Sequence, residues 1–191
     1  FKNDIDAARA CKKEFNDKGM FFECIKFNID GDKALDIKFL EDYNKIILIH
    51  HACDRFSPSK FHNIDLIDYR KQMETTFFST VKLMQTLIKP LNKNKSDIVF
   101  ILSQTLKKNV KGMSHYIAAK KALESLSESL ALEYNNIKFH RFYPNFMPTS
   151  FSEYWDDHFI NFYATEQEDP KDNAKNYVES ILNISGGQID D

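Results

Sequence analysis

Short, continuous apolar runs alternate along the chain with longer segments whose apolar residues recur at helical spacing. The apolar runs are residues 45–50, 98–102 and 137–143. Runs of this length and continuity are typical of strands that helices cover on both faces. Helical spacing is found over residues 65–89 and 115–134, and Pro90 is expected to end the first of these helices. The alternation predicts an α/β fold, a doubly wound and mostly parallel sheet with helices on both faces.

The two ends of the chain extend this alternation. Residues 7–17 have near-helical spacing, and the aromatic-rich run 20–27 that follows predicts a strand. Towards the other end, residues 170–182 predict a last helix, and 185–190 predict a turn into a final edge strand. Both ends therefore fit the same α/β pattern.

The connection at residues 149–169 is rich in aromatic and acidic side chains and includes Trp155. A loop of this composition is expected either to close over a substrate as a lid or to pack its aromatic rings in the ordinary way beneath a loop. The sequence favours neither explanation over the other.

Composition and charge narrow the classes of protein to which the chain can belong. Its 191 residues are 42% hydrophobic, enough for one core, and we expect residues 1–191 to form a single domain. The net charge is -2 with acidic and basic residues interspersed, which argues against a nucleic-acid partner. No apolar stretch approaches the roughly 20 residues of a transmembrane helix, and the start of the chain has no signal-peptide pattern, so we expect no membrane partner.

Cysteine and histidine positions bear on the cellular compartment and on metal binding. Cys11, Cys24 and Cys53 are widely spaced and odd in number, which matches neither a disulfide framework nor a set of zinc ligands. His50 and His51 are adjacent on a predicted strand, so their side chains point to opposite faces and cannot hold one metal ion. We therefore expect a cytoplasmic protein with no metal site.

Three polar side chains are expected to meet at the carboxyl edge of the sheet, where ligands of such folds bind. Tyr116 and Lys120 are four residues apart on a predicted helix, hence neighbours on one face, and Ser103 directly follows a predicted strand. A lysine charge beside a phenol is expected to lower the tyrosine pKa, as a general acid for a carbonyl oxygen requires. Taken alone, a tyrosine and a lysine at this spacing are more often just a solvated helix face.

The surrounding sequence favours a catalytic pair over a solvated helix face, because the chain resembles the short-chain dehydrogenase/reductase family in five ordered places. These are Ser103, the Tyr116 and Lys120 pair, the strand end at 50–53, the segment 144–149 and the closing residues 187–189. The similarity is greatest to the 3-oxoacyl-[acyl-carrier-protein] reductase type. It implies a Rossmann-like fold, with the family's first strand, glycine-rich turn and helix expected to precede Phe1.

The resemblance also implies roles for individual residues. Tyr116 would be the acid/base, Lys120 would hold the nicotinamide ribose and tune Tyr116, and Ser103 would orient the substrate carbonyl. Thr76 stands where the family has a catalytic asparagine, and Asn28 where it has an aspartate against the adenine. The other implied cofactor contacts are His50, Ala52, Pro144 and Thr149, and the implied cofactor is NADP or NAD, with NADP slightly favoured.

These residues predict an oxidoreductase that transfers a hydride between NAD(P)H and a carbonyl substrate. The substrate is expected to be a small molecule or a 3-oxoacyl thioester on acyl carrier protein. The Ala, Leu and Ser residues of helix 115–134 favour a homodimer or homotetramer, although a stripe facing the core explains part of that pattern. Since His50 to Cys53 replace the family's Asn-Asn-Ala-Gly, a degenerate member that acts as a binding or assembly subunit is the alternative.

Overall fold

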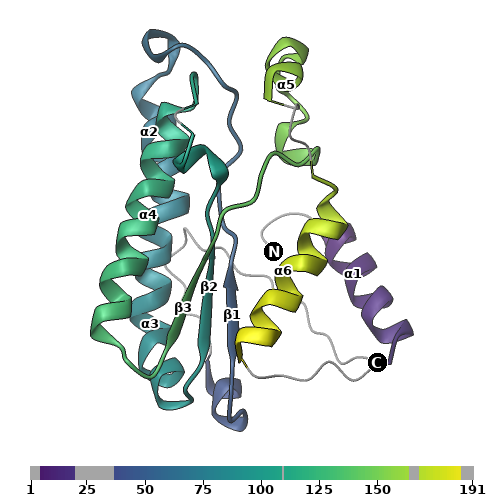
Figure 1. The fold of residues 1–191 in the computed structure, drawn as a ribbon, viewed down its shortest axis with the longest axis vertical. Coiled ribbons are helices and arrows are strands. Elements are labelled where there is room, and N and C mark those ends of the chain that lie inside the picture. Colours follow the sequence, from purple (N-terminus) through teal and green to yellow (C-terminus); the bar gives the residue numbers. More distant parts are fainter. Residues whose placement is uncertain (1–4, 20–36, 109, 164–167, 186–191) are drawn as a thin grey trace.

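The core of the molecule is a three-stranded parallel sheet (Figure 1). The structure is a computed structural model, and it describes residues 5–19, 37–108, 110–163 and 168–185. Strands β1 (Ile47–His50), β2 (Asp97–Ile101) and β3 (Lys138–Phe142) lie in the order β1-β2-β3. The predicted α/β fold with a parallel sheet is therefore confirmed.

Strand β2 is central and every one of its residues is buried, which explains the apolar run that follows Asp97, a buried carboxylate paired with Lys45 and His140. Ile49 pairs with Val99, and Val99 pairs with His140, so the three strands run in register. Beyond the ladder, Leu102 donates its backbone N–H to the Phe142 carbonyl at 2.7 Å. The residues that follow the three strands consequently emerge at one edge of the sheet.

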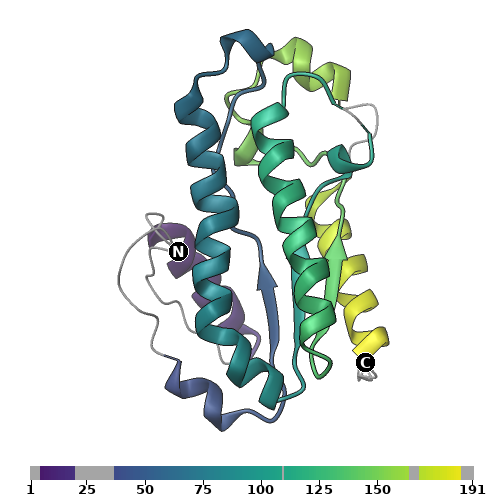
Figure 2. The same ribbon diagram turned by 90° about the vertical axis from the view of Figure 1, so that its left-hand side faces the viewer.

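One face of the sheet is covered by a helical layer (Figures 1 and 2). A continuous rod comprises α2 (Leu66–Met73), the π-helical segment η3 (Glu74–Phe78) and α3 (Ser79–Lys93), and α4 (Ser114–Glu133) lies beside it. Apolar side chains of both helices meet those of the sheet in the main core, which includes Met84, Leu91, Ile98, Phe100 and Leu123.

Pro90 does not end the first long helix as the sequence analysis expected. It lies inside α3, which continues to Lys93. The proline ring removes the N–H that would bond to the carbonyl of Thr86, but Thr86 is exposed, so water can satisfy that carbonyl. Continuing the helix buries Leu91 to 1% exposure, which compensates for the missing hydrogen bond.

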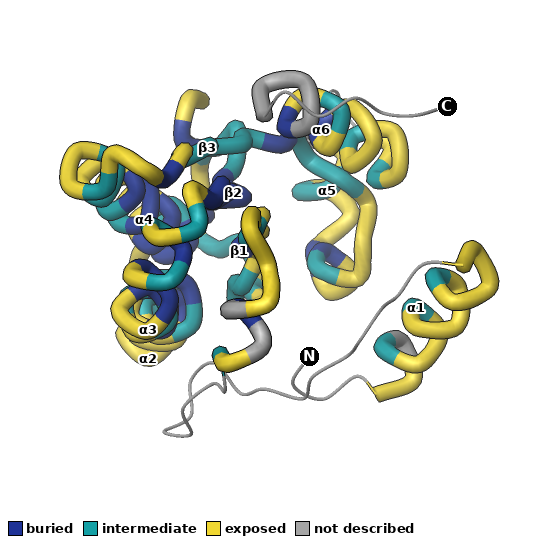
Figure 3. Tube along the Cα trace, turned by 90° about the horizontal axis from the view of Figure 1, so that it is seen from below, coloured by how far each residue is buried: buried dark blue, intermediate teal, exposed yellow. Residues whose placement is uncertain are grey.

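The opposite face of the sheet is covered by α6 (Pro170–Ser185), with α1 (Ile5–Asp17) on the same side (Figures 1 and 3). Tyr177 and Ile181 of α6 are buried against Val99, Ile101 and Phe142. The Tyr177 and Phe142 rings stack with centroids 3.7 Å apart. Helices thus lie on both faces of the sheet, as the sequence predicts.

The remaining expectations concern the connections and the ends of the chain. The expected strand 20–27 lies outside the described residues, and so does most of the edge strand expected at 185–190, although Ser185 itself is helical. The loop 149–169 contains two helical pieces, η5 (Ser150–Ser152) and α5 (Asp157–Tyr163). No helix within the described ranges combines the length and apolar character needed to cross a membrane.

Candidate active site

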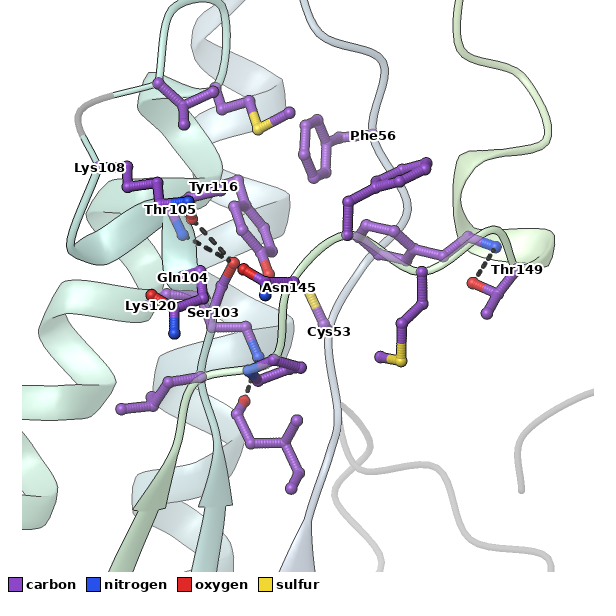
Figure 4. A pocket seen from close by; sticks show the side chains of 18 of the residues that line it. Cys53, Phe56, Ser103, Gln104, Thr105, Lys108, Tyr116, Lys120, Asn145 and Thr149 are labelled. Carbon is purple, nitrogen blue, oxygen red and sulfur yellow. Dashed lines mark hydrogen bonds between the residues drawn. The ribbon is translucent and has the colours of Figure 1, made fainter. Parts of the chain in front are cut away.

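A cavity of about 780 Å³ opens at the carboxyl edge of the sheet (Figure 4). Its walls come from the segments that follow each of the three strands, from the start of α4 and from the loop that includes η5. Ser103, Tyr116 and Lys120 all line it. The structure therefore brings the three predicted catalytic side chains to one cavity.

Ser103 is the first residue of the turn after β2, and its backbone is extended. Its hydroxyl oxygen accepts hydrogen bonds from the Thr105 backbone N–H at 3.2 Å and from the Thr105 hydroxyl at 3.0 Å. Because both bonds use the oxygen as acceptor, the hydroxyl hydrogen of Ser103 can be donated to the Tyr116 oxygen or to a group in the cavity. The turn thus fixes the position of a donor.

Tyr116 and Lys120 lie one turn apart on α4, and both are buried, with 9% and 2% exposure. The Lys120 ammonium donates to the Ile101 carbonyl at 2.7 Å, and it lies 5.9 Å from the centre of the Tyr116 ring. The carbonyl at the end of β2 therefore positions the lysine against the cavity. Figure 4 shows the two side chains beside Ser103.

The ionisation of Tyr116 differs from the sequence-based expectation. Burial raises the pKa of Tyr116, and the negative charge that Cys53 can carry adds to the increase, while hydrogen bonding with the Ser103 hydroxyl lowers it. The pKa of Lys120 is itself lowered by burial. The prediction that Lys120 sets a lowered tyrosine pKa is wrong in this structure, because desolvation of the ring is the larger effect.

Thr76 lies in η3 and is fully buried behind the cavity rather than in its lining. Its backbone carbonyl accepts from the Thr80 hydroxyl at 2.6 Å. No hydrogen bond of ordinary length and angle joins the Thr76 hydroxyl to the described residues. The hydroxyl still interacts with the Cys53 thiol and lowers its pKa, but burial raises that pKa by more. The expected role of Thr76 in catalysis stays a prediction, and Cys53 separates it from the substrate space.

His50 and His51 point to opposite sides of the strand end, as their adjacency predicts, and of the two it is His51 that lines the cavity, so the expected cofactor contact of His50 stays a prediction that its position does not support. The His50 ring is buried against the helices, with Nε2 2.9 Å from the Thr80 hydroxyl, and it does not line the cavity. His51 and Cys53 line the cavity, whereas Ala52 does not. The two-residue alternation of a strand, extended past residue 50, would have indicated this arrangement.

Acidification should destabilise the fold through His50. Burial lowers the pKa of His50 from 6.5 to about 4, so protonation favours the unfolded chain as the pH falls from about 6.5 towards 4. Between pH 7.5 and pH 5 this histidine should cost about 2 kcal/mol of unfolding free energy. Urea unfolding of wild type and of His50→Gln at both pH values measures this cost. The variant is needed because burial also lowers the pKa of His51 and His115, so the pH dependence of the wild type contains all three histidines. An equal pH dependence in the two proteins would contradict the prediction.

The segment after β3 crosses the cavity from Asn145, beside Ser103, to Thr149 on the side away from α4 (Figure 4). The Pro144 carbonyl accepts from the Gln104 backbone N–H at 2.9 Å, which ties the ends of β2 and β3 together. Pro144, Asn145 and Thr149 all line the cavity. Of the expected cofactor contacts, Pro144, Thr149, Tyr116 and Lys120 are therefore at the cavity, and Asn28 lies outside the described residues.

Aromatic side chains form one wall of the cavity, and the sequence analysis identified only part of it. Trp155, expected in a lid, donates its indole N–H to the Phe56 carbonyl at 2.7 Å. Phe56, Phe146 and Phe151 join it in the lining. Phe56 was missed because its loop has no periodic pattern, and its only signal is an aromatic residue in a polar connection that follows a strand.

Comparison with known proteins identifies the family. Residues 2–158 match the family model for short chain dehydrogenase. Among solved structures, a short-chain dehydrogenase from Streptomyces avermitilis is 22% identical with a TM-score of 0.71, covering 91% of this chain and 71% of that protein. A 7α-hydroxysteroid dehydrogenase complexed with NADH and 7-oxo glycochenodeoxycholic acid is 20% identical with a TM-score of 0.67, covering 82% of this chain and 64% of that protein.

The structural neighbours share the fold, and the chain spans roughly two thirds of their lengths, 71% and 64%. None of the curated proteins matches the sequence significantly. The family match extends over most of the described residues, from α1 through the start of α5, and it includes Ser103, Tyr116 and Lys120. On this match the chain belongs to the short-chain dehydrogenase family.

Proposed function

We propose that the protein is an NAD(P)-dependent oxidoreductase that interconverts a ketone and a secondary alcohol. The observation that carries the proposal is the meeting of Ser103, Tyr116 and Lys120 in one cavity at the carboxyl edge of the sheet. A hydroxyl donor, a phenol and an ammonium at one site are the groups that a carbonyl oxygen needs when it gains a proton.

Each side chain has a separate part in the reaction. Tyr116 donates its phenolic proton to the carbonyl oxygen, since burial raises its pKa and keeps it protonated near neutral pH. Ser103 donates a hydrogen bond to the same oxygen from its fixed position in the turn after β2. Lys120 supplies a positive charge on the tyrosine side of the cavity, which favours the phenolate that remains after proton transfer.

A nicotinamide cofactor supplies the hydride when it is bound, and the residues at the cavity fit such a group. The Lys120 ammonium makes its bond to Ile101 with one N–H, so further N–H groups remain for the hydroxyls of a ribose. Pro144, Asn145 and Thr149 also line the cavity, and the Thr149 hydroxyl and the backbone of this segment are suited to an amide. His51 and Cys53 stand where the family has an asparagine and a glycine. Their larger side chains leave less space for the cofactor at this strand end.

The proposal also includes the type of cofactor, the substrate and the assembly. We favour NADP slightly over NAD, and a small molecule or a 3-oxoacyl thioester on acyl carrier protein as the substrate. The Ala, Leu and Ser residues of α4 favour a homodimer or homotetramer, the cysteine pattern favours the cytoplasm, and the interspersed charge argues against a nucleic-acid partner. The altered residues His50 to Cys53 and Thr76 make a non-catalytic binding or assembly subunit the alternative that an experiment has to exclude.

Cofactor binding distinguishes these two functions. At a concentration one hundred times its Kd, NADPH or NADH should stabilise the full-length protein by about 2.7 kcal/mol, a rise in Tm of roughly 5 to 10 °C. ATP at the same concentration is the control for a general nucleotide effect. The enzyme proposal also requires oxidation of the bound cofactor when a ketone is added. This oxidation is measured as the loss of absorbance of the reduced nicotinamide. No rise in Tm and no oxidation with either cofactor would overturn it.

A further inference from the structure

We propose that the substrate carries a planar apolar body, such as an aryl ring, a short linker away from its carbonyl group, and that Phe56 is the residue that selects it. This inference rests on the proposed function, because it places the ring beside the tyrosine that donates the proton. It favours a ring-bearing ketone over a linear 3-oxoacyl chain. The argument begins with the arrangement of aromatic rings around Tyr116.

Phe56 stacks on Tyr116 with ring centroids 4.8 Å apart and an interplanar angle of 26°. The Trp155 ring lies 5.3 Å from Phe56, and the Phe151 ring lies 5.5 Å from it in an edge-to-face arrangement. All four side chains line the cavity. A substrate carbonyl that reaches the Tyr116 hydroxyl therefore lies beside an aromatic surface that can hold the group attached to it.

This aromatic wall is held in place by hydrogen bonds between separate segments. The Trp155 indole N–H donates to the Phe56 carbonyl at 2.7 Å, and the Ser59 backbone N–H donates to the Gly112 carbonyl at 2.9 Å. A Cβ atom added to Gly112 would lie 2.8 Å from the Phe159 ring, so the loop before α4 packs closely on α5. The wall is thus built into the fold and does not have to form around the ligand.

The cavity offers space as well as a surface. Its volume of about 780 Å³ is in the range of sites that hold a small molecule together with part of a cofactor. Its described lining residues include no Asp or Glu, and Val110, Met113 and Met147 add apolar surface to the aromatic wall. Aromatic rings prefer stacked or edge-to-face neighbours, so a planar ring gains more here than a saturated ring of equal hydrophobicity.

A series of ketones with the same methyl ketone group tests the inference. Benzylacetone carries a phenyl ring, its cyclohexyl counterpart carries a saturated ring, and methyl hexyl ketone is linear; the acetoacetyl thioester of N-acetylcysteamine represents the linear acyl class. Turnover is measured as kcat/KM with the cofactor that binds. Binding is measured separately by quenching of Trp155, the single tryptophan of the chain.

Benzylacetone should have a kcat/KM about tenfold above that of the cyclohexyl ketone, and it should exceed both linear compounds. Phe56→Leu keeps an apolar side chain but removes the planar face, and it should reduce the phenyl preference to about twofold or less. Phe61→Leu is the matched control, because Phe61 lies on the same connection, is 74% exposed and does not line the cavity. It should leave the preference unchanged.

The outcomes separate the inference from the proposed function. Turnover with equal kcat/KM for the phenyl and cyclohexyl ketones, or with the linear thioester preferred, would overturn the inference and leave the oxidoreductase proposal standing. Quenching of Trp155 by benzylacetone, stronger than by the cyclohexyl ketone but without turnover of any of the four carbonyl compounds, would support the ring-binding wall and count against the reaction. Absence of both binding and turnover for all four compounds would overturn both.

Discussion

Replacing Tyr116 by phenylalanine should lower kcat for carbonyl reduction by about a thousandfold, the contribution expected of a positioned general acid. The substitution removes only the hydroxyl, so the ring keeps its stacked contact with Phe56 and the cavity keeps its shape. Lys120 still bonds to the Ile101 carbonyl, and the affinity for the nicotinamide cofactor should therefore change by less than about threefold. Steady-state rates and cofactor titration on the same preparation measure the two quantities.

Tyr143→Phe provides the control for this substitution. Tyr143 also packs against α4, where its hydroxyl donates to Glu124 at 2.6 Å, but it does not line the cavity. Its loss should leave kcat within about twofold of wild type, since it touches neither the substrate nor the reacting oxygen. If Tyr116→Phe kept more than about a tenth of the wild-type kcat, the assignment of Tyr116 as the proton donor would fall.

The features that could be predicted from the sequence are those with a strong local pattern. The unbroken apolar run at 98–102 belongs to a central strand, which is buried on both faces and so tolerates no polar residue there. The spacing of Tyr116 and Lys120 required only a helix to bring them together, and α4 supplies it. Ser103 joins them because parallel strands deliver the residues after them to one edge of the sheet.

Features that depend on packing between distant segments could not be predicted in the same way. Phe56 lies against Tyr116 in a loop that is held by segments far along the chain, among them Trp155, which donates to its carbonyl. Pro90 stays inside a helix because the burial of Leu91 outweighs one lost hydrogen bond. The pKa of Tyr116 is raised because burial of the whole ring, invisible in a pair of residues, outweighs the hydrogen bonding with Ser103 that lowers it.

Burial also decides what the loss of Lys120 should do to stability. The pKa of Lys120 is lowered by burial, so the charged form is disfavoured in the folded protein and destabilises it at every pH below the ordinary lysine pKa of 10.5. Lys120→Met removes that destabilising charge and keeps most of the side-chain volume, but it leaves the Ile101 carbonyl without its donor. These effects oppose each other, and the unfolding free energy should stay within about 2 kcal/mol of wild type.

Activity should respond far more strongly to the same substitution. Without the ammonium, the ribose hydroxyls lose a charged donor and the Tyr116 phenolate loses a nearby positive charge, so kcat/KM for reduction should fall at least a hundredfold. Cofactor affinity should fall as well, which separates this variant from Tyr116→Phe. Lys121→Met is the matched control, because Lys121 is on the same helix but half exposed and paired with Glu124. A Lys120→Met protein that binds cofactor and reduces ketones like wild type would show that this lysine is a structural residue, and the three-residue site would lose its cation.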